Sequence, residues 1–491
     1  MRITRVALIE TFVVFSLILL SVPLRFYQLG FSDYIPDEPG AFLLNNDPAK
    51  TGMSATSFFM GQRKGPMQFL ISHIPYLITK NFNNEFAQRL PFAVFNTLAV
   101  VLFYLFVKNT TDNRLVGITA AVLLSLNGFA VAFGRTAQYQ SLNMFLSFTA
   151  LYFYSQLITS KQNLVAKTLA GTVALSLSIL SHWDAVFILP PIIIFFTKFL
   201  LDKTFQREYK IRLLGLNFLL GCTLLLPFLM PYIQTLRMDR ANQEYLWDRV
   251  GLRPDIDQNG NVFTFSLYNP FLAIWLYAIM GVAGLLAYKK SYIFAVWAAF
   301  VLAIFIFLVH HSGTHIYNLT IPVIILVAAG FEKTLKVVPN YLGIIVALGM
   351  GGFLYYQSYL LFVDHKVEYP WEREHILSWK TPGHSALDNM RNKIGFPHKR
   401  YWKEINEYVN RQNQENGEDF GFITNEDKSL SSYYMDVERT QNLDGFYYIG
   451  IKRPYSFQTD WKMPQVKNKE EVHQIDNEYG ESVVKIYRVS R

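Results

Sequence analysis

Residues 115–134 read LVGITAAVLLSLNGFAVAFG, a stretch without a single charged side chain. An α-helix needs about 20 mainly apolar residues to cross the hydrocarbon core of a bilayer, and this stretch has that length. Similar uncharged runs extend from Thr11 to Pro23, from Leu213 up to Arg237 and from Ser291 to Val309. Only 17% of the residues are charged, against about 25% in soluble proteins. The pattern predicts an α-helical protein that crosses the membrane many times.

Hydrophobicity and basic residues together predict the topology. We expect about eleven transmembrane helices, at 7–27, 87–107, 115–133, 141–159, 165–181, 184–201, 212–232, 268–287, 292–309, 316–333 and 340–361. Lysine and arginine are concentrated in every second short loop, for example Lys203–Arg212. Basic short loops stay in the cytoplasm, so these loops and the N-terminus are expected there. They also account for the formal net charge of +8, so no nucleic-acid partner is implied.

The segment Met67–Thr79 is apolar but too short to cross the membrane. Counting it as a span would place the later basic loops outside, against the charge rule. We therefore expect a helix that lies in the outer membrane interface or re-enters it.

The composition changes after about Val363. Residues 1–363 are predicted to form the membrane domain, and residues 364–491 a soluble extracytoplasmic α/β domain. Periodicity in this polar region predicts a helix near Tyr401–Arg411 and strands near 419–424, 445–451 and 482–489. The expected location is the cell (inner or plasma) membrane, with the C-terminal domain outside the cytoplasm.

The first outer loop contains YIPDEPGAFLLNND, in which Asp37 and Glu38 are adjacent acids. Neighbouring carboxylates can bind a divalent cation, or one can act as a general base. The alternative is an ordinary solvated loop. Further along, Arg63, Lys64 and Arg89 could attract a phosphate at the membrane surface, or their side chains could extend to the lipid headgroups.

The order of these motifs resembles the GT-C membrane glycosyltransferases. The Asp-Glu pair after the first helix, the Gly/Pro segment before the interfacial helix and the RLP that opens the next helix are similar to protein O-mannosyltransferases and bacterial aminoarabinose transferases. The resemblance covers roughly 1–360. It implies transfer of a sugar from a polyprenyl-phosphate donor to an extracytoplasmic protein, lipid or glycan. Asp37 would be the general base or the acid that orients the acceptor, and Glu38 would support it or help to hold a divalent metal such as Mg or Mn.

The second outer loop reads FGRTAQYQSLNMF. Members of the family often carry an acid five residues after this arginine, whereas here the position is Gln140. An amide can hydrogen-bond a sugar but cannot act as a base or a strong metal ligand. Arg135, Gln138, Tyr139 and Gln140 are expected donor contacts. The alternative is that the loop only caps two helices.

Two later outer turns are candidates for donor contacts. In SHWDAVF, His182 and Asp184 could face a cavity, or Asp184 could cap the following helix. In HHSGTHIYN the three histidines suggest zinc, but their spacing matches no regular zinc motif. His315 and Tyr317 resemble the family's late motif that contacts the lipid phosphate.

A stretch outside the resemblance, RPDIDQNGNVF, matches the first half of a calcium loop. Asp255, Asp257 and Asn259 stand at positions 1, 3 and 5, but Ser266 stands where the bidentate glutamate belongs. The sequence therefore allows either a calcium site or an Asn-Gly hairpin turn.

Two other functions remain open. A lipid or glycan transporter or flippase would more often carry polar residues at mid-span or broken helices in two halves. A catalytically inactive sugar-binding relative would explain Gln140. The candidate residues are concentrated in outer loops, which favours the enzyme. The sequence contains no Walker or GxGxxG motif, which argues against a nucleotide-driven machine.

The alternating basic loops lead to a topological test. A reporter that is active only in the cytoplasm, fused after Arg491, should give no signal because the C-terminal domain is expected outside. Strong reporter activity would contradict both the topology and an outward-facing active site.

Overall fold

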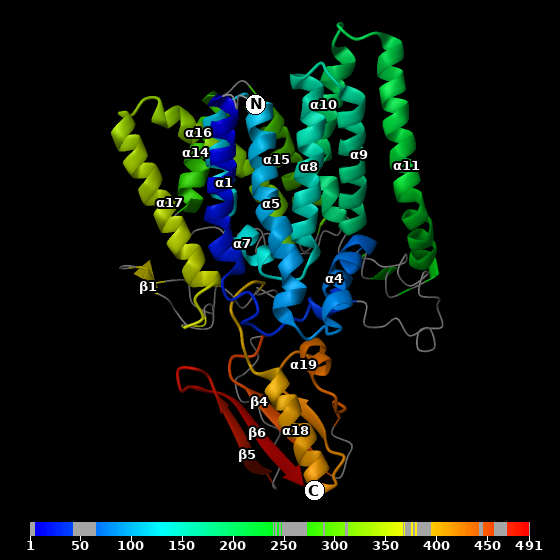
Figure 1. Ribbon diagram of the computed structural model, residues 1–491, viewed down its shortest axis with the longest axis vertical. Coiled ribbons are helices and arrows are strands. Elements are labelled where there is room, and N and C mark those ends of the chain that lie inside the picture. Colours follow the sequence, from blue (N-terminus) through cyan, green and yellow to red (C-terminus); the bar gives the residue numbers. More distant parts are fainter. Residues whose placement is uncertain are drawn as a thin grey trace.

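A helical bundle and a small α/β unit make up the protein (Figure 1). The computed structural model describes residues 5–42, 65–238, 240, 243–244, 247, 273–287, 290–309, 313–366, 368, 375–376, 379–380, 394–440, 445–455 and 469–490. The α/β unit lies beyond one end of the bundle, which we call the domain-facing end (Figure 1).

The bundle helices lie where hydrophobicity predicts helices, but they begin and end at other residues than expected. They are α1 (Arg5–Phe26), α5 (Glu85–Thr111), α6 (Arg114–Leu126), α7 (Gly128–Gly134), α8 (Tyr139–Thr159), α9 (Leu164–Ser181), α10 (Leu189–Leu201), α11 (Arg207–Met238), α14 (Ala273–Ala287), α15 (Ser291–Phe307), α16 (Tyr317–Leu335) and α17 (Asn340–Phe362). Among the described residues, seven helical segments are long and apolar enough to cross a membrane, or eight if the bent pair α6–α7 is one span. The expected number of about eleven is therefore not confirmed.

Two physical features account for part of the difference in number, and the rest comes from α14 and α15, whose described helices have only 15 and 17 residues. The predicted span at 115–133 is broken at Asn127, whose extended backbone stops α6 and whose side chain accepts the Phe129 N–H at the start of α7, so the two helices meet at 60°. Helix α8 has 21 residues, but buried polar side chains such as Asn143 and Gln156 lower its hydropathy below that of a typical span. Those side chains lie between helices rather than against lipid.

Close packing holds the bundle together. Phe103 of α5, Phe148 of α8 and Trp297 of α15 belong to one buried core. Helices α14 and α16 cross at glycines, because a Cβ on Gly284 would lie 2.0 Å from the Leu326 carbonyl oxygen. Small residues at such crossings let two helix backbones approach closely within a membrane.

The expected interfacial segment is α4 (Pro66–Thr79). Its 14 residues correspond to about 21 Å of helix, less than the hydrocarbon thickness of about 30 Å. The helix lies at the domain-facing end (Figure 1). Ile74 and Ile78 are exposed, which suits a helix that rests in the membrane interface. Gly65 precedes it with φ +87°, where a Cβ would collide with the Leu180 carbonyl of α9.

The C-terminal unit is a four-stranded sheet in the order β3-β4-β6-β5, with β3 parallel to β4 and the other pairs antiparallel. Its elements are α18 (Trp402–Asn416), β3 (Gly421–Thr424), α19 (Lys428–Tyr434), β4 (Gly445–Ile451), β5 (Lys469–Asp476) and β6 (Ser482–Ser490). A two-stranded ribbon, β1 (His375–Ile376) with β2 (Trp379–Lys380), precedes it. The sequence indicated α18 and three of these strands. It did not indicate β5, an exposed edge strand without apolar alternation.

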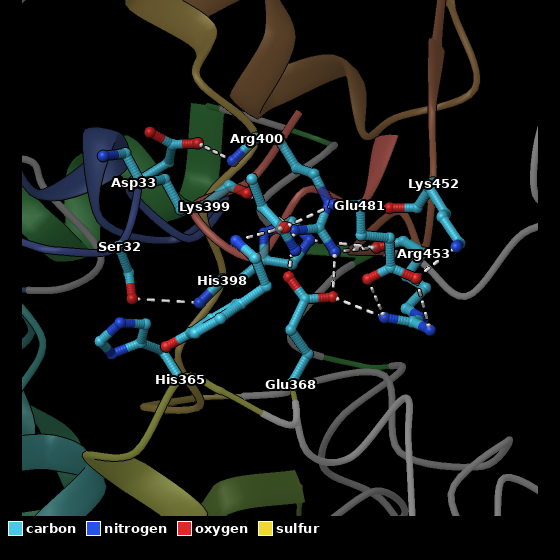
Figure 2. A network of polar contacts seen from close by, with 12 residues as sticks. Ser32, Asp33, His365, Glu368, His398, Lys399, Arg400, Lys452, Arg453 and Glu481 are labelled. Carbon is cyan, nitrogen blue, oxygen red and sulfur yellow. Dashed lines mark hydrogen bonds and ion pairs between the residues drawn. The ribbon is translucent and has the colours of Figure 1, made fainter. Parts of the chain in front are cut away.

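The first loop of the bundle and the C-terminal unit are joined by backbone hydrogen bonds (Figure 2). Asp33 N–H donates to the His398 carbonyl at 3.0 Å, and His398 N–H donates to Ser32 Oγ at 3.0 Å. Arg400 N–H donates to Asp33 Oδ2 at 2.6 Å. Burial raises the pKa of Asp33 to about 6. Tyr34 of the loop also belongs to the apolar core of the C-terminal unit.

Ion pairs between buried charges hold Arg400 in place next to these hydrogen bonds (Figure 2). Arg400 is fully buried, and its Nη1 lies 2.6 Å from Glu368 Oε1. Glu368 also pairs with Arg453 at 2.9 Å, and Arg453 pairs in turn with Glu481 at 3.3 Å. Each of these buried charges therefore has an opposite partner, which offsets the cost of removing it from water.

Glu426 makes the stability of the C-terminal unit depend on pH. Burial raises the pKa of its carboxyl to about 7, although the N–H groups of Tyr455 and Asp427 oppose the shift. Because the folded-state pKa exceeds the unfolded value, the stability that Glu426 contributes is fully present below pH 4.5 and is lost as the pH rises through about 7. A shift from 4.5 to about 7 corresponds to about 3 kcal/mol. We expect a lower melting temperature at pH 8 than at pH 5, and a smaller difference in Glu426→Gln.

The matched control is Glu438→Gln, which changes an exposed glutamate of the same unit. This variant should keep the full dependence on pH. A Glu426→Gln protein with the same dependence as the wild type would contradict the assignment.

Candidate active site

Glu38 is the centre of a buried hydrogen-bond network at the domain-facing end. Its side chain has no exposed surface. Oε1 accepts from Arg89 Nε at 2.8 Å and from Ala137 N–H at 2.7 Å. Oε2 accepts from Arg89 Nη2 at 2.8 Å and from Ile35 N–H at 2.8 Å. The carboxylate thus receives four hydrogen bonds and has no position left for another ligand.

Arg89, in the first turns of α5, likewise uses all its hydrogen-bond donors inside the protein. Besides the two bonds to Glu38, it donates to the carbonyls of Leu29, Ser32 and Asp33, at 3.2, 2.8 and 2.8 Å. Five N–H groups are all that a guanidinium has. Arg89 therefore presents no donor to a phosphate in this conformation. The pair joins the end of α1, the start of α5 and the loop before α8.

The expected metal at Asp37 and Glu38 does not fit this geometry. A cation there would have to displace the bidentate Arg89 from Glu38. Asp37 differs from its neighbour, because its side chain is exposed. The adjacent acids therefore have different environments, with Glu38 positioned inside the protein and Asp37 accessible at the surface.

Arg135, in the loop between α7 and α8, faces the C-terminal end of α1. It donates to the carbonyls of Leu24, Tyr27 and Gln28, at 3.1, 2.9 and 3.3 Å. Burial lowers the pKa of its guanidinium to about 9. In the part of the chain that the structure describes, no carboxylate pairs with Arg135, so an anion near this loop would be stabilised.

The two glutamines of the same loop are buried. Gln138 and Gln140 are 3% and 2% exposed, and the Oε1 atom of each has no hydrogen-bond partner within the described residues. Buried amide oxygens without partners are uncommon and costly. Both amides are therefore suited to bind hydroxyl groups.

A second polar cluster combines three turns of the chain at the end of α9, in η2 (Trp183–Ile188) and in η4 (Gly313–Ile316). Asp184 Oδ1 lies 2.8 Å from His315 Nδ1 and 3.1 Å from His182 Nδ1. The Tyr139 ring stacks on His182, with ring centres 3.6 Å apart. Tyr317 is buried beside Phe133. Because Tyr139 follows Gln138 directly, this cluster adjoins the loop of Arg135.

The structure thus brings together most of the residues that the sequence singled out. Gathered at this end are Asp37, Glu38, Arg89, Arg135, Gln138, Gln140, His182, Asp184, His315 and Tyr317. Outside the described residues lie Arg63, Lys64, Asp255, Asp257, Asn259, His310 and His311. Sequence reasoning missed Asn143 and Asn318, whose amides fix the backbones of His182 and His315. Asparagines inside apolar helices were the available signal.

Fold and site together define a multi-pass helical membrane protein with a polar site at one end of its bundle. Residues 63–233 match the family described as dolichyl-phosphate-mannose-protein mannosyltransferase. The resemblance to the GT-C membrane glycosyltransferases is thereby confirmed. An uncharacterized protein of Aquifex aeolicus (strain VF5) is 27% identical over 203 residues, which is 40% of each chain.

Solved structures of similar architecture have low sequence identity. ArnT of Cupriavidus metallidurans bound to undecaprenyl phosphate is 12% identical, with 99% of this chain and 98% of that chain covered and a TM-score of 0.49. The Saccharomyces cerevisiae Pmt1–Pmt2 complex bound to the sugar donor is 17% identical, with 49% and 35% covered and a TM-score of 0.38. Similarity at this level carries no argument about activity.

The network around Glu38 leads to a stability test. Glu38→Gln leaves the Arg89 charge buried without its partner, which typically costs about 3–5 kcal/mol. We expect a markedly lower melting temperature of the detergent-purified protein. The neighbouring change Asp37→Asn, at an exposed side chain, should leave the melting temperature near the wild-type value. Equal melting temperatures for both variants would show that the ion pair does not hold the site together.

Proposed function

We propose that this protein is a membrane glycosyltransferase, which moves a sugar from a polyprenyl-phosphate donor to an extracytoplasmic protein, lipid or glycan. One observation carries the proposal. The Glu38–Arg89 pair and the Ala137 N–H hold the loop of Asp37 against the loop of Arg135. An accessible acid and a buried cation without a carboxylate partner thus share one end of the bundle. The match of residues 63–233 to lipid-linked mannosyltransferases supports this chemistry.

In the proposed reaction, Asp37 accepts the proton of the acceptor hydroxyl. The freed oxygen attacks the anomeric carbon of the donor sugar, and the bond from that carbon to the phosphate oxygen breaks. The lipid phosphate leaves with its electron pair. The positive charge of Arg135 favours that anion, because no described carboxylate neutralises it. Gln138 and Gln140 supply amide groups for sugar hydroxyls.

The membrane side offers room for the lipid. A largely apolar cavity of about 420 Å³ opens between α9, α10 and α11. Leu175, Ile192, Phe196, Leu214 and Leu229 are among its lining residues. An isoprenoid chain could lie there, because a groove of this composition matches hydrocarbon. The isoprenoid chain then extends along the bundle toward the domain-facing end, where Leu180 of α9 packs on Phe228 of α11.

Asp37 gives the test of this mechanism. Removal of a positioned general base typically lowers the rate by about 10²–10⁴. We expect Asp37→Asn to lower sugar transfer from a radiolabelled polyprenyl-phosphate donor by that factor in isolated membranes. The melting temperature should stay unchanged, because the Asp37 side chain is exposed.

Asp112→Asn is the matched control. Asp112 is also exposed, and its left-handed backbone (φ 56°) accepts asparagine. This variant should transfer at the wild-type rate. Wild-type transfer by Asp37→Asn would remove Asp37 from the mechanism. If the wild type consumes no polyprenyl-phosphate sugar, the proposed reaction itself is wrong.

A further inference from the structure

We propose that Tyr434, the last residue of α19 in the C-terminal unit, is a positioning residue for the loop that carries Asp37. This role rests on the proposed sugar transfer and deepens it, because it makes the C-terminal unit necessary for a correctly placed general base. Tyr434 acts through Tyr34, which lies three residues before Asp37 in the chain. The tyrosine and the aspartate are about 400 residues apart in sequence, so only the fold brings the C-terminal unit to this loop.

The Tyr434 hydroxyl joins two segments of the membrane domain. It accepts the Tyr34 N–H at 2.8 Å and donates to Glu85 Oε1, at the start of α5, at 2.9 Å. Burial, together with the nearby carboxyl groups of Asp33 and Glu85, raises the pKa of Tyr434 well above its usual range. The hydroxyl therefore keeps the proton that it donates. One oxygen atom of the C-terminal unit thus holds both the first loop and the start of α5.

Tyr34 is the point at which the first loop is fixed. The residue is 1% exposed, and its own hydroxyl donates to the Phe82 carbonyl at 2.6 Å. Its ring stacks with the Tyr434 ring, with centres 6.0 Å apart. The Arg89 guanidinium lies over the Tyr34 ring, 5.3 Å from its centre, which is a cation–π contact. Tyr34 therefore contacts both the C-terminal unit and the arginine that pairs with Glu38.

The peptide groups next to Tyr34 have other partners. The Asp33 N–H donates to a carbonyl of the C-terminal unit at 3.0 Å, and the Ile35 N–H donates to Glu38 Oε2 at 2.8 Å. The Tyr34 N–H has one acceptor within the described residues, the Tyr434 hydroxyl. Without that acceptor a buried N–H would have no partner, and such groups are rare because they are costly. The loop would then rearrange, and the general base that it carries would move with it.

Helix α19 is itself held in place, so Tyr434 has a defined position. At its start, Asp427 Oδ1 accepts the Ser429 N–H at 2.8 Å. Just beyond its end, the Asp436 N–H donates to Asn406 Oδ1 of α18 at 2.9 Å, and Asn406 Nδ2 donates to Asp436 Oδ2 at 2.7 Å. The fold of the C-terminal unit therefore determines where the Tyr434 hydroxyl lies.

Tyr434→Phe tests the proposal, because it keeps the ring and removes the hydroxyl. Displacing a reacting group by about 1 Å can cost about 100-fold in rate. We expect kcat for transfer from the radiolabelled polyprenyl-phosphate donor to fall by about 10- to 100-fold. The KM for the donor should stay unchanged, because the lost contact serves the reaction step rather than donor binding. Rates are measured well below the melting temperature of the variant, so that loss of folded protein does not contribute.

Tyr433→Phe is the matched control. Tyr433 precedes Tyr434 in α19, and its ring packs edge-on to the Tyr34 ring with centres 5.7 Å apart. Its buried hydroxyl has no hydrogen-bond partner among the described residues. Removing that hydroxyl breaks no hydrogen bond, so kcat and KM should keep their wild-type values. An equal loss of kcat in both variants would overturn the role of the Tyr434 hydroxyl.

A double variant shows whether the effect runs through Asp37. In Asp37→Asn the base is already absent, so adding Tyr434→Phe should lower kcat no further. A residue that only supports the fold would lower kcat by the same factor in the wild type and in Asp37→Asn. That proportional loss would contradict the positioning role.

Hydrogen–deuterium exchange of the full chain in detergent gives a readout that needs no substrate. Peptides that cover residues 33–38 should exchange faster in Tyr434→Phe and at the wild-type rate in Tyr433→Phe, because only the first change removes the acceptor of the Tyr34 N–H. Unchanged exchange in Tyr434→Phe, or faster exchange with an unchanged kcat, would overturn the proposal. If the wild type consumes no polyprenyl-phosphate sugar, the proposed function fails, and the exchange comparison still decides whether Tyr434 holds the loop.

Discussion

The buried ion pair between Glu38 and Arg89 is the interaction on which the site depends. Each partner uses its full hydrogen-bonding capacity inside the protein, and the contacts reach the end of α1, the start of α5 and the loop before α8. Such a pair adds little net stability compared with an apolar core, but it tolerates only one arrangement of its surroundings. Because Asp37 is adjacent to Glu38 in the chain, the ion pair also fixes the position of the exposed Asp37.

The C-terminal unit also holds the first loop of the bundle in place. The carbonyl of Asp33 receives Arg89 from the bundle, while its carboxylate receives the Arg400 N–H from the C-terminal unit. Tyr434 of α19 donates to Glu85 at the start of α5, and Lys403 of α18 pairs with the same glutamate. The first loop is therefore held between the two parts.

Polar groups at the domain-facing end remain incompletely satisfied within the described chain. Arg135 has no carboxylate partner there, and the side-chain oxygens of Gln138 and Gln140 are buried without a hydrogen-bond partner. A folded protein normally removes such costs. Their concentration beside an accessible acid is the physical reason for proposing an anionic ligand that carries hydroxyl groups.

The amino-acid sequence alone determined the membrane class, the approximate positions of most bundle helices and the presence of the short helix α4, because hydrophobic length is a local property. It also selected most residues of the site. The residue pattern alone did not distinguish Asp37 from Glu38, and only the resemblance implied different roles for them. That Glu38 is buried and Asp37 is exposed came from the structure. Only the tertiary structure placed Arg89 against Glu38 and brought His315 to Asp184, because both contacts join segments far apart in sequence. Contacts of that kind depend on how helices pack, which the local pattern of residues does not encode.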